Sequence, residues 1–151
     1  MSNLQRLFSE LIRFETELWN AVDARLRSEY DLPLSRFEPM QVIARHGSCR
    51  INDIARELII TVGGTSKLVD RIEASGYCCR LPNPHDRRSS IIELTPEGRR
   101  LLAEATEIFE EELQLRLGSV QSPCSLQQFA ESLSRLRSAG RNAQQAEKAV
   151  R

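Results

Sequence analysis

The sequence has little that would suit a membrane protein, a metal centre or an enzyme. No apolar run approaches the ~20 residues of a membrane-spanning helix. Residues 1–19 contain acidic side chains and no signal-peptide core, so we expect a cytoplasmic protein. The four cysteines form no C-x-x-C pair, which argues against a disulfide framework or a zinc site. With two histidines, no nucleophile motif and no phosphate loop, we expect neither enzymatic activity nor a cofactor.

The overall net charge is zero, but charge is unevenly distributed along the chain. The 151 residues include 21 basic and 21 acidic side chains. Residues 45–100 hold ten basic and seven acidic residues, whereas 1–44 and 101–151 each hold more acidic than basic residues. A basic middle between acidic flanks permits a nucleic-acid-binding module on an acidic frame, although it does not establish one.

Apolar residues at helical spacing predict four helices in the first half of the chain. Leu32-Pro33 interrupts the first periodic run. Thr61 is a suitable N-cap, and Gly47 and Gly76 are suitable stops because glycine readily adopts a left-handed conformation. The last two helices are short and are joined by a tight connector, Ile59-Ile60, which is a helix-turn-helix pattern. The expected helices cover residues 4–30, 35–46, 51–58 and 61–75.

The segment that follows has the character of strands. Residues 77–81 and 91–94 are short strand candidates, and the turn-forming, basic stretch PNPHDRRSS lies between them. A strand, a basic loop and a second strand directly after a helix-turn-helix form a wing. Thr95-Pro96 then begins another helix, with Thr95 as N-cap and Pro96 at the first helical position.

The predicted fold is therefore mainly α with a small β-wing: a winged helix-turn-helix lobe plus N- and C-terminal dimerisation helices. The apolar stripes of the flanking helices exceed what so small a core absorbs, so we expect them to pair across a two-fold axis in a homodimer. Burial against the core of a monomer is the alternative. We expect residues 1–32 to form the N-terminal dimerisation helix, 33–98 the lobe (recognition helix about 61–76, wing about 77–95), 99–140 the C-terminal dimerisation helices, and 141–151 a polar, frayed tail.

Three motifs, in this order, resemble the MarR family (multiple antibiotic resistance regulators). Residues 86–98, DRRSSIIELTPEG, are similar to the wing signature D-x-R followed by a strand and L-T-x-x-G. Residues 51–58, INDIAREL, resemble its L-A-x-x-L helix, and 65–77, TSKLVDRIEASGY, its recognition helix. The resemblance covers about residues 35–100. The wing begins with Asn-Pro where Asp-Pro is common, and Gly63-Gly64 replaces small hydroxyl residues, which leaves the base-reading contacts open.

The resemblance implies a protein that binds double-stranded DNA, with the recognition helix in the major groove and the wing tip in a flanking minor groove. Arg88 suits the narrow minor groove of A·T-rich DNA, and the resemblance implies that Asp86 holds it in a bidentate pair. Gly63-Gly64 is either a close approach to DNA or a tolerant first turn, and Lys67 and Arg71 either contact DNA or are solvated. The implied DNA-binding residues are Thr61, Gly63, Gly64, Thr65, Ser66, Lys67, Arg71, His85, Asp86, Arg87 and Arg88.

The resemblance also implies a transcriptional repressor of its own and adjacent genes. Such a protein binds a pseudo-palindromic operator and leaves it when a small aromatic or anionic ligand binds between the dimerisation helices and the lobe. For Trp19 the favoured interpretation is a core anchor rather than a ligand platform. Cys78 and Cys79 are interpreted as structural, and Cys124 is a candidate for oxidation between subunits. The candidate ligand-binding residues are Trp19, Asp23, Arg27, Phe37 and Met40.

One alternative function stays open at this stage. A winged helix can also serve as a protein–protein adaptor, because a fold alone does not determine function. An adaptor has no need for Asp86 and Arg88 in the wing, and it would not bind DNA even at low salt.

Overall fold

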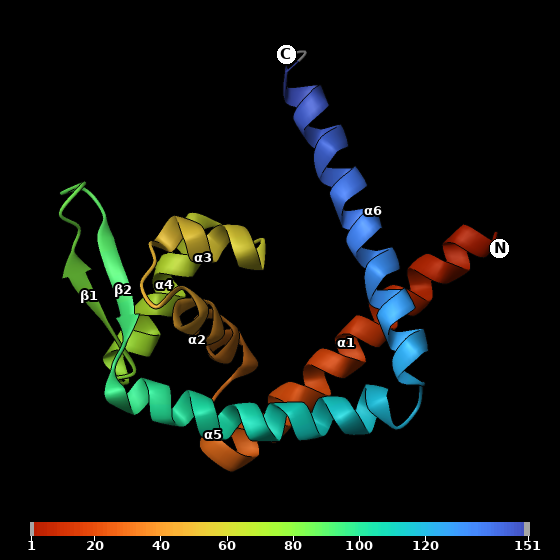
Figure 1. Cartoon of the computed structure of the whole chain (residues 1–151), viewed down its shortest axis with the longest axis horizontal. Helices are drawn as coiled ribbons and strands as arrows, with labels where there is room; N and C mark the ends of the chain where they lie inside the picture. The colour runs from red at the N-terminus through yellow and green to blue at the C-terminus, as the bar shows by residue number, and fades with distance from the viewer. Residues whose placement is uncertain (1, 150–151) are drawn as a thin grey trace. The chain divides into compact units, whose positions relative to one another are not determined.

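The computed structural model describes residues 2–149 and is built from helices and one small sheet (Figure 1). This confirms the mainly α fold with a β-wing. The chain divides into two compact units, one ending at Glu112 and one beginning at Leu113. None of the described helices is long and apolar enough to cross a membrane. The elements are α1 (Asn3–Tyr30), α2 (Leu34–His46), α3 (Ile51–Leu58), α4 (Val62–Ala74), β1 (Cys78–Pro82), β2 (Ser90–Leu94), α5 (Pro96–Leu113), the π-helical turn η1 (Gln114–Gly118) and α6 (Pro123–Ala149).

The core of the first unit lies where α2, α3 and α4 meet the two-stranded sheet (Figure 1). Phe37 and Ile43 from α2, Ile54 from α3, Ile72 from α4 and Ile92 from β2 are each completely buried. Burying an aliphatic or aromatic side chain of this size is worth about 1.5–3 kcal/mol. These contacts fix α4 against the other elements, so its outer face has a defined orientation.

The wing is an antiparallel pair with one further rung. Cys78 pairs with Leu94 and Pro82 pairs with Ser90 at the two ends of the ladder. Cys49, in the link between α2 and α3, adds an isolated bridge to Ile92, with N–O distances of 3.1 and 2.7 Å. The middle of β2 is therefore tied to the link between α2 and α3, while the wing tip projects beyond α3 and α4 (Figure 1).

The helix caps predicted from the sequence are present in the structure. The Thr61 hydroxyl accepts the Gly64 N–H at 3.0 Å, and Gly76 has φ +81° directly after α4. Thr95 caps α5 by accepting the Gly98 N–H at 3.0 Å, and its hydroxyl also donates to the Gly76 carbonyl at 2.6 Å. One threonine thus joins the end of α4 to the start of α5.

The connector between α3 and α4 contains a strained residue. Ile59 has φ +56°, the left-handed region, and its side chain is 73% exposed. A β-branched residue is a clear outlier there, because its Cβ approaches the following carbonyl at a cost of about 1–2 kcal/mol.

Replacing Ile59 with glycine should therefore stabilise the lobe. Glycine removes the Cβ and with it the strain. A chain with glycine at this position loses more conformational entropy on folding, which costs about 0.5–1 kcal/mol. We expect Ile59→Gly to raise the free energy of unfolding by about 0.5–1 kcal/mol in urea titrations. Ile59→Ala is the control, because it keeps the Cβ and should raise the free energy of unfolding much less. An unchanged or lower stability for the glycine variant would contradict this account.

The expected frayed tail is wrong for the residues that the structure describes. α6 continues through Gly140 as far as Ala149, and residues 141–149 are all exposed. The physical reason is composition, because Arg, Gln, Ala, Glu and Lys favour helix even without burial. The preceding helical run ends at Gly118, and its last residues form the π-helical turn rather than α-helix.

Candidate nucleic-acid interface

The outer face of α4 presents most of the predicted recognition residues to solvent. Thr61, Gly63, Gly64, Lys67 and Arg71 are exposed, and Ser66 is half-buried. Val69 and Ile72, on the opposite side of the helix, are completely buried. The helix thus separates a buried core face from a face available to a partner.

Two residues of this helix differ from expectation. Thr65 is completely buried, and its hydroxyl donates to the Thr61 carbonyl at 2.8 Å. Its predicted contact with DNA is therefore wrong, because the side chain lies on the core face with Val69. Val62, in the first turn, also differs from what an apolar residue on an amphipathic helix leads us to expect, since it is 53% exposed.

The wing tip is shaped by side chains that bond to its own backbone. The Asn83 Oδ1 accepts the His85 N–H at 3.0 Å, and the Asp86 Oδ1 accepts the Arg88 N–H at 2.9 Å. Asn83 also donates to the Ser89 hydroxyl at 2.9 Å. Such local bonds define a turn without a hydrophobic core.

The predicted bidentate pair between Asp86 and Arg88 is wrong. The Asp86 carboxylate bonds to the backbone N–H of Arg88, not to its guanidinium. Over residues 2–149, no ion pair of the Arg88 side chain is found. His85, Asp86, Arg87 and Arg88 are all exposed. The tip therefore carries an available guanidinium on an ordered turn.

A groove of about 480 Å³ lies between α3, α4 and the wing. Three arginines line it, together with polar and apolar side chains from the two helix starts. Arg50 and Asn52 were not predicted as site residues, although their position beside the start of a helix-turn-helix could have indicated them. The lining includes Arg50, Asn52, Val62, Ser66, Arg80 and Arg88.

Arg80 ties the wing to the recognition helix. Its guanidinium donates to Asp70 at 2.6 Å and to Glu73 at 2.9 Å, and its backbone N–H donates to Glu73 at 3.0 Å. Its side chain is 24% exposed. Both carboxylates belong to α4 and Arg80 belongs to β1, so these bonds hold the wing in register with α4.

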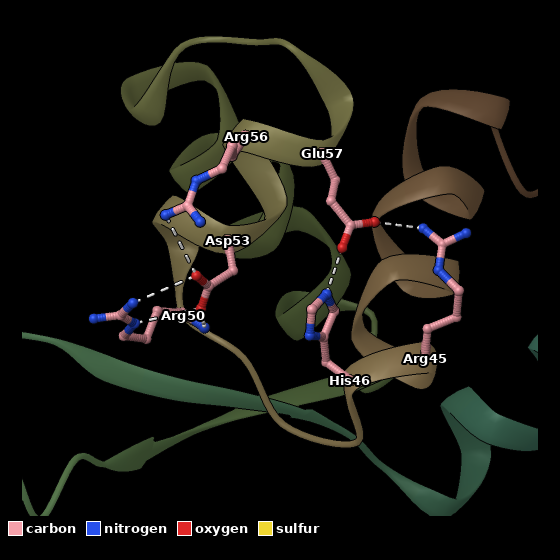
Figure 2. A network of polar contacts seen from close by, with 6 residues as sticks. All are labelled: Arg45, His46, Arg50, Asp53, Arg56 and Glu57. Atoms are coloured by element: carbon pink, nitrogen blue, oxygen red, sulfur yellow. Dashed lines mark hydrogen bonds and ion pairs between the residues drawn. The ribbon is translucent and has the colours of Figure 1, made fainter. Parts of the chain in front are cut away.

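A polar network surrounds α3 (Figure 2). The Asp53 carboxylate accepts the Arg50 backbone N–H at 2.9 Å and also faces the Arg50 and Arg56 guanidinium groups. The hydrogen bonds from Arg50, first from its backbone and then from its side chain, lower the pKa of Asp53. The start of α3 and its two arginines are thereby held in place beside the groove.

The other half of this network joins α3 to the end of α2 (Figure 2). Glu57 contacts both His46 and Arg45, the latter at 2.6 Å. The hydrogen bond from His46, followed by the charge of Arg45, lowers the pKa of Glu57. A carboxylate with a lowered folded-state pKa stabilises the fold above its unfolded pKa, here about 4.5.

The contribution of Glu57 should therefore be lost as pH falls through its lowered pKa. We expect the free energy of unfolding of the wild-type chain to fall more steeply between about pH 5 and pH 3 than that of Glu57→Gln. Urea unfolding at a series of pH values measures the difference. The glutamine variant should be the less stable of the two at pH 7, and parallel pH profiles would contradict the assignment.

The five candidate effector residues differ in their surroundings. Phe37 and Met40 are completely buried in the core, and their contacts with a ligand stay a prediction. Asp23 accepts the Leu34 N–H at 2.8 Å at the start of α2 and pairs with Arg27 at 2.7 Å. The half-buried Trp19 borders a shallow hollow on α1.

The cysteines show two different environments. Burial, the largest cause, raises the pKa of Cys49 to about 11 and that of Cys78 to about 12, so both remain thiols at neutral pH. Cys79 is half-buried and Cys124 is exposed. Within residues 2–149 there is no group of three or more His, Cys, Asp or Glu residues able to hold a metal ion.

Comparison with known proteins gives consistent matches. The model of the MarR family matches residues 32–90. The multiple antibiotic resistance protein MarR of Salmonella typhimurium is 28% identical over 104 residues, which cover 65% of this chain and 72% of that protein. The regulator YwhA of Bacillus subtilis, described as an uncharacterized HTH-type transcriptional regulator, is 37% identical over 60 residues. That alignment covers 40% of this chain and spans less than half, 43%, of the relative.

Solved structures agree on the fold over nearly the whole chain. AbsC, a MarR family transcriptional regulator from Streptomyces coelicolor, has a TM-score of 0.85 at 15% identity, covering 94% of this chain and 97% of that chain. A second MarR family regulator from Streptomyces coelicolor, solved in complex with DNA, has a TM-score of 0.82 at 22% identity, covering 90% and 86%. At these identities the likeness shows the fold alone.

Proposed function

We propose that this chain, which the model of the MarR family matches over residues 32–90, is a transcriptional regulator of that family: a homodimeric repressor, located in the cytoplasm, that a small ligand releases from a pseudo-palindromic operator. The single observation that carries the proposal is the groove, with exposed α4 on one side and the available Arg88 guanidinium on the wing. Two structural neighbours, the Streptomyces coelicolor regulator and a mutant of Escherichia coli MarR, were solved with DNA.

The DNA contacts follow from the placement of charge. We propose that the first turns of α4 enter the major groove, where Ser66 and Lys67 face base edges and phosphates. Arg88 reaches the adjacent minor groove, whose narrow A·T-rich form concentrates negative potential. His85, Arg87 and Arg71 are assigned to phosphates, which position the protein without reading sequence.

A second copy of the chain accounts for the apolar surface of α1. Leu4, Phe8 and Ile12 are 77%, 67% and 52% exposed, at helical spacing along one face. Leu7 and Phe14 on the same helix are also exposed. Contiguous exposed apolar side chains indicate a protein interface. A two-fold dimer would place two α4 helices about one DNA turn apart, which is why we expect a dyad-symmetric operator.

The proposed effector is a small aromatic or anionic molecule. The fold neighbour BpsR from Bordetella bronchiseptica has a TM-score of 0.79 at 20% identity, covering 87% of this chain and 98% of that chain, and its DNA binding is regulated by 6-hydroxynicotinic acid. Trp19 and Arg27 would supply an aromatic face and a cation to such a ligand. Since Phe37 and Met40 are buried, the site we propose lies nearer to the surface of α1.

Selection from a random-sequence duplex pool tests the proposal. The full chain should enrich a dyad-symmetric site and bind it with an affinity that falls steeply as salt rises, because phosphate contacts release counterions. Fluorescence anisotropy at fixed salt concentrations measures this dependence. A chain that binds no duplex even at low salt would be better explained as a protein–protein adaptor on a winged-helix fold.

A further inference from the structure

The exposed start of α4 offers few hydrogen-bonding side chains to a partner. Gly63 and Gly64 have none, and the Thr61 hydroxyl already accepts the Gly64 N–H at 3.0 Å. Thr65 is buried and donates to the Thr61 carbonyl. Among the described residues of this turn, Ser66 is the polar side chain that remains at the groove. The first turn of α4 therefore offers few side-chain hydrogen bonds to base edges, and Ser66 and the Thr61 O–H are the groups that could make them.

An apolar side chain occupies the same wall of the groove. Val62 is the first residue of α4, is 53% exposed, and lines the groove with Arg50, Ser66 and Arg88. Next to it, a Cβ added to Gly63 would meet no atom within 4 Å, so the neighbouring backbone is bare. A partner can therefore approach the Val62 methyl groups closely.

The chemistry of the major groove limits what such a side chain can recognise. Base edges there present hydrogen-bond donors and acceptors, together with one apolar group, the C5 methyl of thymine. Arg88 borders the groove without an ion-pair partner among the described residues and supplies positive charge suited to DNA phosphates, whereas Arg50 is already paired with Asp53. Because recognition of a thymine methyl rests on the proposed function, its test must separate loss of that recognition from loss of DNA binding.

We propose that Val62 is a specificity-determining residue that reads a thymine methyl in each half-site. Its two methyl groups pack against the C5 methyl, and the bare Gly63 backbone allows the approach. Selectivity for thymine over cytosine at this position then comes from van der Waals contact and exclusion of water, in a turn that offers few hydrogen-bonding side chains.

Removal of single methyl groups from DNA tests the proposal. In the duplex that the wild-type chain selects from a random pool, each thymine is replaced singly by deoxyuridine, which removes the C5 methyl and leaves the pairing groups unchanged. Anisotropy at one salt concentration then compares wild type with Val62→Ala. Ile60→Ala is the matched control, since Ile60 is a neighbouring exposed aliphatic residue that is not among the groove-lining residues.

We expect one thymine per half-site at which deoxyuridine weakens wild-type binding about fourfold, the effect of roughly one methyl group. Val62→Ala should bind the thymine and deoxyuridine duplexes equally, and Ile60→Ala should behave like wild type. Alanine at an exposed first-turn position favours helix, so the variant should fold. Selective binding without any methyl-sensitive thymine, or methyl sensitivity that persists in Val62→Ala, would overturn the inference. Failure to select any duplex would instead overturn the proposed function.

Discussion

Replacing Arg88 with alanine is expected to weaken binding to the selected duplex by about ten- to a hundredfold, corresponding to roughly 1–3 kcal/mol for a groove-reading arginine. The guanidinium has no ion-pair partner among the described residues, so little protein structure depends on it. Its backbone N–H, which bonds to Asp86, is kept in the variant. Anisotropy titration measures the affinity, and thermal melting should show an unchanged midpoint.

Arg87→Ala is the matched control for this prediction. It removes the same charge from the neighbouring exposed position, but we assign Arg87 to a phosphate. Its removal should weaken binding to all sequences similarly and reduce the slope of log affinity against log salt by about 0.9. Arg88→Ala should in addition reduce the preference for A·T pairs beside the major-groove contacts. Equal effects of the two substitutions on all sequences would contradict the assigned roles.

Replacing Gly98 with alanine should destabilise the lobe more than any other glycine-to-alanine change considered. A Cβ at this position would lie 1.9 Å from the Tyr77 carbonyl oxygen. That carbonyl cannot easily withdraw, because it accepts the Thr95 N–H at 3.0 Å, and Thr95 also caps α5 at Gly98. We expect a loss of about 3 kcal/mol or more in the free energy of unfolding.

Differential scanning calorimetry checks this prediction, with Gly63→Ala as the control. For a chain of this size, 3 kcal/mol corresponds to a fall of about 6–12 °C in melting temperature. Gly63 lies in the first turn of α4 with open space around it, so alanine there should leave stability unchanged or raise it by up to about 1 kcal/mol. A Gly98→Ala variant that melts like wild type would contradict the close approach.

The sequence predicted the backbone of the lobe well, because the residues that begin and end its helices have specific local roles. Thr61 and Thr95 act as caps, and Gly47 and Gly76 have φ of +72° and +81° at helix ends, as expected. Ile59, in the connector between α3 and α4, lacks such a signal, since it is an isoleucine in a conformation that favours glycine. Local composition predicted where helices end, whereas burial of the surrounding helices imposes the strained turn.

Side-chain roles were harder to predict because one sequence spacing fits several geometries. The Asp86-x-Arg88 spacing suits an ion pair, but it equally suits the observed bond from the Asp86 carboxylate to the backbone. Thr65 lies four residues before the buried Val69, so helical periodicity could have placed it on the core face. Phe37 and Met40 are apolar residues of α2, and the sequence pattern of such residues is the same whether they line a cavity or fill the core.

The most direct test of the account is the stoichiometry of the complex with its selected duplex, measured by sedimentation velocity. If paired lobes read DNA together, the complex will contain two chains per duplex, and the two half-sites will lie about 10 base pairs apart, centre to centre. A stable complex of one chain on one duplex, formed on a site without dyad symmetry, would contradict it.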